Sequence, residues 1–298
     1  MRFVLLCIVL AAYGCVDSGA RVLDLNLFVS GTAQSEPASL RSGWNATLER
    51  ADLVFGPFTL CAAAASGVAC ESARAEWNDA VVVDTLRADE VLVGAMQGTT
   101  GFVGSWMYDL GFVSSLSQTE PFALNATQAL DGASYRIEGI AQKGDSMVPF
   151  FASLSIKRSA QNDHIVDQGK PIVRRTGAAI EHELTESSDG LHIRFNPSRW
   201  LVSINFDDSF VEQSCASPER NIVCRRADPA DVLPTLAHQC VDGELAPATD
   251  CVASEEFCVR DIGCVDRLEL REGTQGAAAI RSAIVAGEAP EFEWSVEP

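Results

Sequence analysis

Apolar and polar residues alternate along several stretches of this chain, as in strands that bury one face. Residues 21–29 (RVLDLNLFV) predict a first strand, and residues 44–55 predict another. Near the end, residues 291–296 alternate in the same way after a helix-like run, GAAAIRSAIVAG. The chain is therefore expected to be mostly β, with short helices.

Three pairs of alternating segments are separated by turn-forming residues, and each pair predicts a hairpin. The first covers residues 90–110 around Gly98–Gly101, and the third covers residues 178–196 around Asp189-Gly190. The second covers residues 135–154 around Lys143-Gly144-Asp145. Hairpins of this kind predict an antiparallel β-sandwich.

Two details of these hairpins concern buried positions. In the second hairpin, Gly139 is expected to lie opposite Val148 or Phe150 and to leave room for a large side chain. In the third, His182 should face the core on an apolar strand face, because alternation points it away from Glu181 and Glu183.

Composition changes at Asp207, where aromatic residues become rare and cysteines frequent. The run DCVASEEFCVRDIGCV is similar to small disulfide-knotted repeats of secreted bacterial proteins, a resemblance that implies no activity. The expected organisation is a signal segment (1–20), a strand and linker (21–43), a β-sandwich (44–206), a Cys-rich module (207–271) and a helix and strand returning to the sandwich (272–298).

The first twenty residues predict export. Arg2 precedes an apolar run from Phe3 to Ala12, which is shorter than the roughly 20 residues that span a bilayer. Ala12-Tyr13-Gly14-Cys15 resembles a bacterial lipobox, which implies cleavage before Cys15 and lipidation of that residue. Ser18-Gly19-Ala20 is the alternative site, for ordinary signal peptidase.

The lipobox resemblance implies a protein anchored in a membrane of the cell envelope. The residue after the lipidated cysteine is Val16. An Asp at that position would mark retention in the inner membrane, so the outer membrane is favoured. Periplasmic or secreted protein is the expectation if the alternative cleavage site is used.

Eight cysteines follow the signal segment, and an even number in an exported chain predicts disulfides. Local pairs are expected first, Cys61 with Cys70 and Cys215 with Cys224, because each closes a short loop. The eight are Cys61, Cys70, Cys215, Cys224, Cys240, Cys251, Cys258 and Cys264.

Charge limits the range of partners. The chain has 41 acidic and 22 basic residues, a formal net charge of −19, which argues against binding to nucleic acid. The expected partners are the membrane, through the lipid, and a protein or carbohydrate ligand at the cell surface. No cofactor is expected.

Two motifs suggest chemistry. Gly144-Asp145-Ser146 and Asp189-x-x-His192 resemble the blocks of GDS-type lipases and esterases, which implies Ser146 as nucleophile, His192 as base and Asp189 as its orienting acid. Both motifs fall in predicted turns, where Gly, Asp and Ser are common for backbone reasons. His182 is the candidate ligand of the alternative, a periplasmic metal-binding protein.

We therefore expect a non-enzymatic, extracytoplasmic lipoprotein with a binding or structural role at the cell envelope. A secreted GDS-type serine hydrolase and a periplasmic metal-binding protein are the alternatives.

Overall fold

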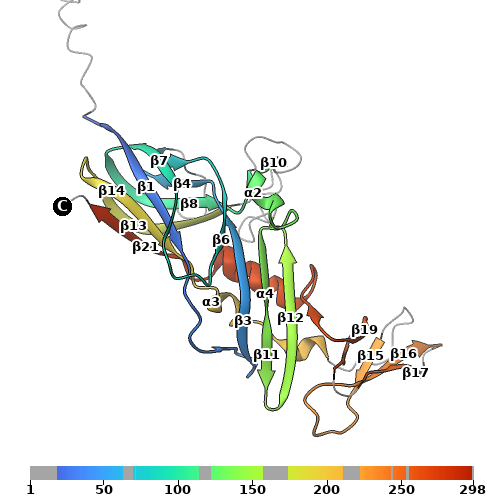
Figure 1. Ribbon diagram of the computed structural model, residues 1–298. Coiled ribbons are helices and arrows are strands. Elements are labelled where there is room, and N and C mark those ends of the chain that lie inside the picture. The colour runs from blue at the N-terminus through green and yellow to red at the C-terminus, as the bar shows by residue number, and fades with distance from the viewer. Residues whose placement is uncertain are drawn as a thin grey trace, which may run out of the picture.

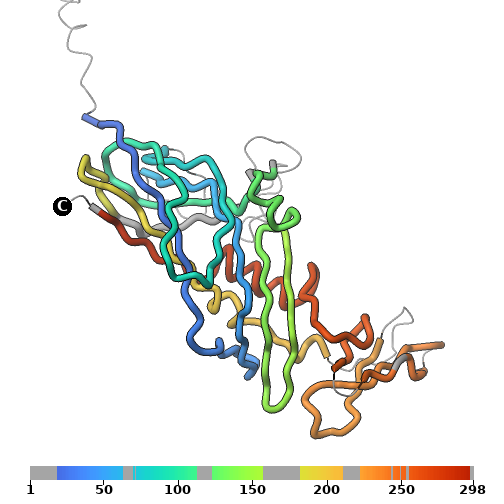
Figure 2. The backbone as a smooth tube through the Cα atoms, viewed as in Figure 1, coloured from blue at the N-terminus to red at the C-terminus, as the bar shows by residue number. Residues whose placement is uncertain are grey.

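The computed structural model of the chain describes residues 19–62, 70, 72–113, 122–156, 174–210, 222–242, 244–252 and 255–296. Two large sheets form the body of the protein, and a smaller Cys-rich module lies at the end opposite the first described strand (Figure 1). The tube in Figure 2 shows the last strand returning to the end where the chain begins. No helix among the described residues is long and apolar enough to cross a membrane.

The larger sheet has eight strands, nearly all antiparallel; β1 and β14 are a parallel pair. In order across the sheet they are β13 (Arg174–Leu184), β8 (Gly101–Asp109), β4 (Phe58–Cys61), β5 (Ala73–Trp77), β7 (Val91–Thr99), β1 (Val22–Ser30), β14 (Ser188–Arg194) and β21 (Glu291–Val296).

The second sheet has six strands, centred on β3 and the hairpin β11–β12. They are β2 (Ala38–Ser39), β3 (Asn45–Phe55), β11 (Tyr135–Lys143), β12 (Ser146–Leu154) and β20 (Leu268–Glu269), with β6 (Val81–Asp84) paired to β3.

Short elements connect and cover the sheets. The helices are α2 (Asn125–Gln128), α3 (Ser198–Leu201), the 3-10 helix η2 (Phe206–Ser209) and α4 (Gln275–Ala286), and β9 (Phe112–Val113) pairs with β10 (Phe122–Ala123).

Both sheets and α4 contribute to one hydrophobic core. Leu25 of β1, Leu53 of β3, Phe150 of β12 and Ile280 of α4 are all fully buried within it. Helix α4 begins where Thr274 accepts a hydrogen bond from the backbone N–H of Ala277, at 3.2 Å. The prediction of a mostly β sandwich with short helices is confirmed.

The second predicted hairpin is confirmed as β11–β12. Gly139 pairs with Phe150, and a Cβ at Gly139 would lie 2.3 Å from the carbonyl oxygen of Thr47 and 3.0 Å from Cζ of Phe150. Glycine is therefore required because strand β3 and the Phe150 ring leave no space for a side chain.

The first and third predicted hairpins are wrong. Only Thr100 separates β7 from β8, yet β7 pairs with β1 and β5, whereas β8 pairs with β4 and β13. Residues 185–187 join β13 to β14, and those strands lie near opposite ends of the sheet order. In both cases the turn reverses the chain, but partners distant in sequence take the hydrogen bonds.

The position of β13 and β14 shows that the larger sheet curls. The backbone N–H of Ser188 donates to the carbonyl of Thr185 at 3.0 Å, so the connection is tight. His182 on edge strand β13 stacks on Trp294 of the other edge strand, β21, with ring centroids 4.0 Å apart. The two edges of the sheet therefore approach each other around the core.

The Cys-rich module consists of a three-stranded sheet and a hairpin. The sheet contains β15 (Ile222–Arg225), β16 (Leu236–Val241) and β17 (Glu244–Asp250), and the hairpin contains β18 (Phe257–Val259) and β19 (Gly263–Val265). The Cys224–Cys258 and Cys251–Cys264 disulfides attach the hairpin to the sheet.

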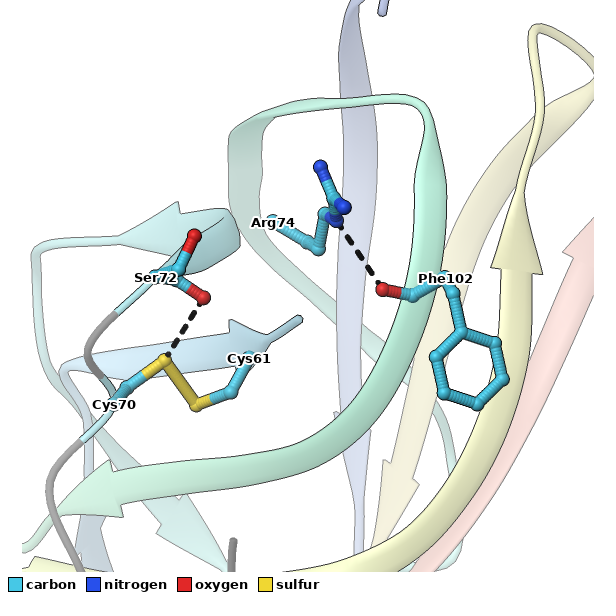
Figure 3. The surroundings of a disulfide bond; sticks show 5 residues. All are labelled: Cys61, Cys70, Ser72, Arg74 and Phe102. Atoms are coloured by element: carbon cyan, nitrogen blue, oxygen red, sulfur yellow. Dashed lines mark hydrogen bonds between the residues drawn. A yellow bond between two sulfur atoms is a disulfide. The ribbon is translucent and has the colours of Figure 1, made fainter. Parts of the chain in front are cut away.

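The described disulfides bear out one local pair and correct another. Cys61 pairs with Cys70 at the end of β4, close to Ser72, whose carbonyl lies 3.4 Å from Cys70 Sγ (Figure 3). The prediction that Cys224 pairs with Cys215 is wrong, because Cys224 pairs with Cys258. The strand pairing places Cys224 beside the later hairpin, which sequence spacing did not indicate.

Cys240 is also disulfide-bonded, and Cys215 lies outside the described residues. Disulfides of this number persist in oxidising compartments and are rare in the cytosol. The protein is therefore extracytoplasmic.

Replacement of Gly139 by alanine should destabilise the fold by about 1–3 kcal/mol, because the new methyl group meets the backbone of β3. Met147→Ala, on the neighbouring strand at 61% exposure, should change stability by less than about 0.5 kcal/mol. Urea denaturation of both variants measures the difference. Equal stability of the two variants would contradict the close approach of β3 to β11.

Besides the disulfide of Cys240, peptide mapping under non-reducing conditions should recover the links of Cys61 with Cys70, Cys224 with Cys258, and Cys251 with Cys264. Replacing Cys224 and Cys258 together by serine should cost about 2–4 kcal/mol in the free energy of unfolding. A peptide linking Cys215 to Cys224 would contradict the described pairing.

Candidate functional site

An open groove lies between the β11–β12 turn and the Cys-rich module, with a volume of about 580 Å³. This size is within the range of ligand sites in proteins, roughly 300–1,000 Å³. We refer to it as the junction groove. Its lining residues are Asp145, Ser146, Met147, Pro149, Ala227, Asp231, Val232, Leu233, Thr235, Glu255, Glu256, Phe257 and Asp266.

The hairpin supplies one wall of the junction groove. Gly144 has a φ of +59°, which glycine adopts readily in a tight turn. Along β12, Val148 and Phe150 point into the core, so alternation directs Met147 and Pro149 away from it. Met147 is consequently 61% exposed beside the groove.

The module supplies the other wall, which internal bonds hold in place. The backbone N–H of Cys258 donates to the carbonyl of Pro234 at 2.8 Å, and that of Cys251 donates to the carbonyl of Thr235 at 3.1 Å. Phe257 is 5% exposed and packs edge-on against Phe210, with centroids 5.7 Å apart. The module wall is therefore built on the disulfide-linked hairpin and on the main core.

An ion pair fixes the tip of the hairpin. Lys143 Nζ lies 2.6 Å from Asp207 Oδ2 and 5.7 Å from the ring centroid of Trp44. The indole N–H of buried Trp44 donates to the other carboxylate oxygen of Asp207 at 3.0 Å. Lys143, the cation of the turn, therefore forms an ion pair with Asp207 and a cation–π contact with Trp44.

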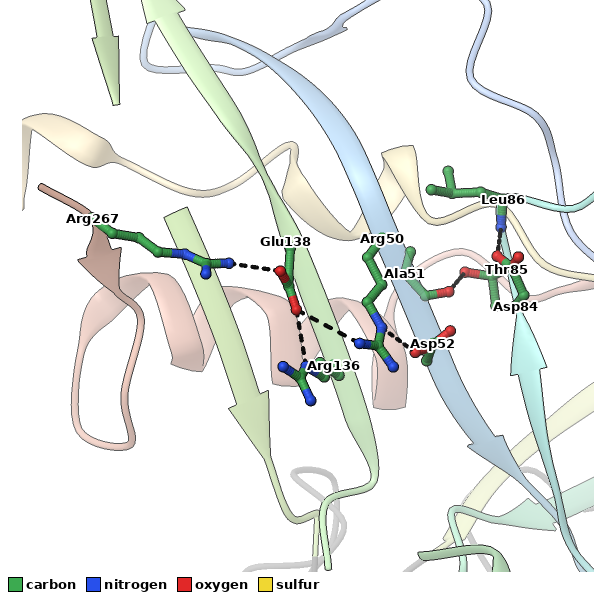
Figure 4. Close-up of polar contacts among 9 residues, drawn as sticks. All are labelled: Arg50, Ala51, Asp52, Asp84, Thr85, Leu86, Arg136, Glu138 and Arg267. Atoms are coloured by element: carbon green, nitrogen blue, oxygen red, sulfur yellow. Dashed lines mark hydrogen bonds and ion pairs between the residues drawn. The ribbon is translucent and has the colours of Figure 1, made fainter. Parts of the chain in front are cut away.

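A charged cluster ties the end of the module to the outer face of the six-stranded sheet (Figure 4). Glu138 accepts hydrogen bonds from Arg267 at 2.8 Å and from Arg136 at 2.9 Å. Arg50 lies 3.8 Å away from the same carboxylate and also pairs with Asp52. The guanidinium groups of Arg267 and Arg136 lower the pKa of Glu138 below its ordinary value.

This cluster also aligns the module with the hairpin. The Arg267 guanidinium lies over the Phe151 ring, 5.0 Å from its centroid, while the backbone N–H of Leu270 donates to the carbonyl of Phe151 at 2.8 Å. Together with the short parallel pairing of β12 and β20, these contacts fix one side of the groove relative to the other.

The charge of the junction groove is wholly acidic. Five carboxylates line it and no lysine, arginine or histidine does. Within the described part of the chain, none of the five forms an ion pair with a cation. The five are Asp145, Asp231, Glu255, Glu256 and Asp266.

The predicted hydrolase residues do not come together. Ser146 begins β12 at the hairpin tip, whereas His192 belongs to β14 of the other sheet, and Figure 1 shows these places at opposite ends of the molecule. His192 stacks on Phe28, and its Nδ1 lies 3.0 Å from a carboxylate oxygen of Glu90. Asp189 lies 3.4 Å from the side-chain nitrogen of Asn26.

His182 lies on the inner face of its strand, as alternation predicts, and stacks on Trp294. Its Nε2 is buried and has no hydrogen-bond partner among the described residues, so it is not the satisfied core histidine that is common in proteins. Burial lowers the pKa of His182 below its ordinary value. No group of three His, Cys, Asp or Glu side chains in the described regions could share a metal ion.

Cys15, the predicted lipidation residue, lies outside the described residues. The groove carboxylates were not predicted as a site. Asp145 was considered only as part of a turn and of the Gly144-Asp145-Ser146 motif, and the other four carboxylates come from three places between residues 231 and 266. The available signal was the acidic residues that lie between the later cysteines, such as Glu255 and Glu256 between Cys251 and Cys258.

Neither a protein-family description nor a curated protein matches this chain. Among solved structures it is similar to MbnP from Methylosinus trichosporium, with 11% sequence identity and a TM-score of 0.27. The match covers 83% of this chain and 99% of that one. A likeness this distant assigns neither function nor site residues.

Lowering the pH from about 7 to about 5 should reduce stability partly through His182. Unfolded His182 takes up a proton near its ordinary pKa of about 6.5, while the folded protein resists protonation, so the free energy of unfolding falls as pH falls. His182→Phe keeps a ring on Trp294 and removes this titration. Urea denaturation at both pH values should therefore show a smaller loss for the variant.

His192→Phe is the matched control, because it also replaces a stacked histidine by phenylalanine. If it reduces the pH dependence as much as His182→Phe does, burial of His182 is not the cause.

Proposed function

We propose that this chain is a binding protein of the cell envelope, held at a membrane by a lipid on Cys15, that engages its ligand in the junction groove. The observation that carries the proposal is the position of the groove. It lies at the hairpin tip and module, at the end of the molecule opposite the start of β1 (Figure 1).

This arrangement suits a tethered protein. Residues 16–21 separate Cys15 from Val22, the first residue of β1. The seven steps from Cys15 to Val22 extend to roughly 25 Å at most, at about 3.3–3.6 Å per residue. The end with β1 would then face the membrane, and the groove would face away from it, where a partner can reach it.

A binding role also fits the chemistry of the groove. Ser146 lines it, but His192, the base that the hydrolase alternative requires, lies in the other sheet. His182 lies at the seam between β13 and β21 and does not line the groove. The groove therefore offers apolar surface and negative charge, which are recognition features.

Replacing Cys15 by alanine should release the protein from the membrane fraction of the cells that produce it and abolish incorporation of labelled palmitate. A lipid thioether on Cys15 is the only anchor in this proposal, so the effect should be complete. Cys7→Ala is the control, since Cys7 also lies in the apolar leader. Retention of label and membrane association in Cys15→Ala would contradict lipid anchoring.

A further inference from the structure

We infer that the junction groove binds a basic segment of a partner polypeptide, in which lysines or arginines flank an apolar side chain. The inference rests on the proposed binding role of the groove but does not depend on the lipid anchor.

The first reason is the apolar surface of the groove. Met147, Pro149, Val232 and Leu233 line it together with Phe257. Met147 is 61% exposed, and methionine on a binding surface adapts to different apolar partners because its side chain is unbranched and flexible. An apolar side chain of the partner would bury this surface and gain the usual hydrophobic stabilisation.

The second reason is charge complementarity. Asp145, Glu255 and Asp266 are exposed at the groove, and Asp231 and Glu256 are partly buried there. Of the cations that adjoin the groove in sequence, Lys143 and Arg267 are paired with Asp207 and Glu138, and Arg226 lines the neighbouring pocket instead of the groove. No cationic side chain lines the groove itself, so a ligand that carries positive charge complements it, and opposite charges at the rim favour encounter and orientation.

The spacing of the carboxylates favours a polypeptide over a metal ion. They come from four separate places in the chain, and none belongs to a group of three side chains that could share an ion within the described residues. Calcium requires six to eight oxygen atoms within about 2.3–2.6 Å. An extended chain with several cationic side chains can instead reach carboxylates that are spread along a groove.

A carbohydrate ligand fits less well. Sugar rings stack on exposed aromatic faces, whereas Phe257, the aromatic residue of the groove, is 5% exposed and packs against Phe210. Nucleic acid would be repelled by the same carboxylates that attract lysine and arginine.

The test measures binding of a fluorescein-labelled peptide, Lys-Lys-Leu-Phe-Lys-Lys, to the purified full chain by fluorescence anisotropy. The groove variant combines Asp145→Asn, Glu255→Gln and Asp266→Asn. It should weaken binding about tenfold at low salt, because three favourable charge interactions are lost. Added salt should weaken binding to the wild type more than to the variant.

The control variant combines Asp24→Asn, Glu36→Gln and Glu76→Gln. These residues are also exposed, lie outside the groove and change the net charge equally. The control should bind the peptide as the wild type does. Equal weakening by both triple variants would show that net charge alone attracts the peptide and would overturn the inference.

Two further comparisons test the apolar contact. Met147→Ala should weaken binding several-fold while leaving urea denaturation unchanged. The peptide with Leu and Phe replaced by Ser should bind correspondingly weakly, and the peptide with Glu for Lys should not bind. The inference would be overturned if Met147→Ala bound the original peptide as tightly as the wild type does, or if the wild type bound either altered peptide as tightly as the original one. Failure of the wild type to bind the original peptide would also overturn it.

The outcomes for the two proposals are separable. Peptide binding lost in the groove variant supports the groove inference even if Cys15→Ala stays on the membrane. Palmitate on Cys15 without peptide binding supports the anchor and removes the groove inference.

Discussion

The ring of Phe55 joins the two sheets of this protein. It ends β3 of the six-stranded sheet, and its centroid lies 5.2 Å from that of Tyr108 and 5.7 Å from that of Phe58, both in the eight-stranded sheet. Trp77 and Phe195 complete its surroundings at 5.9 and 5.5 Å. Because all these side chains are buried, the relative placement of the sheets depends on their packing.

The alternation of apolar and polar residues predicted where strands form, but it predicted which strands pair with each other in only some cases. Gly139 and Phe150 were recognisable as neighbours because they belong to one hairpin, where sequence distance and spatial distance agree. β13 and β14 are equally close in sequence but join opposite ends of a curled sheet, since β14 buries Leu191 and Ile193 beside β1. The pairing partners of β13 and β14 are decided by packing across the whole core, so a stretch of about twenty residues does not predict them.

The candidate site was predictable to a smaller degree. The acidic net charge and the Cys-rich module were evident, but the groove requires Asp145 of the hairpin to lie near Glu255 and Asp266 of the module. That contact depends on the pairing of β12 with β20 and on the ion pair of Arg267 with Glu138, two residues 129 positions apart in the chain. The hydrolase motif was misleading for the same reason: Ser146 and His192 are separated by the fold.

The disulfides that join described cysteines are confined to single parts of the protein. Cys224–Cys258 and Cys251–Cys264 lie within the module, and Cys61–Cys70 closes a loop of the sandwich. Attachment of the module to the sheets in the described regions is non-covalent, through Phe257, Arg267 and β20. Reduction of Cys224–Cys258 and Cys251–Cys264 would therefore remove covalent links inside the module, whereas no described disulfide joins one large sheet to the other and their packing around Phe55 would keep its contacts.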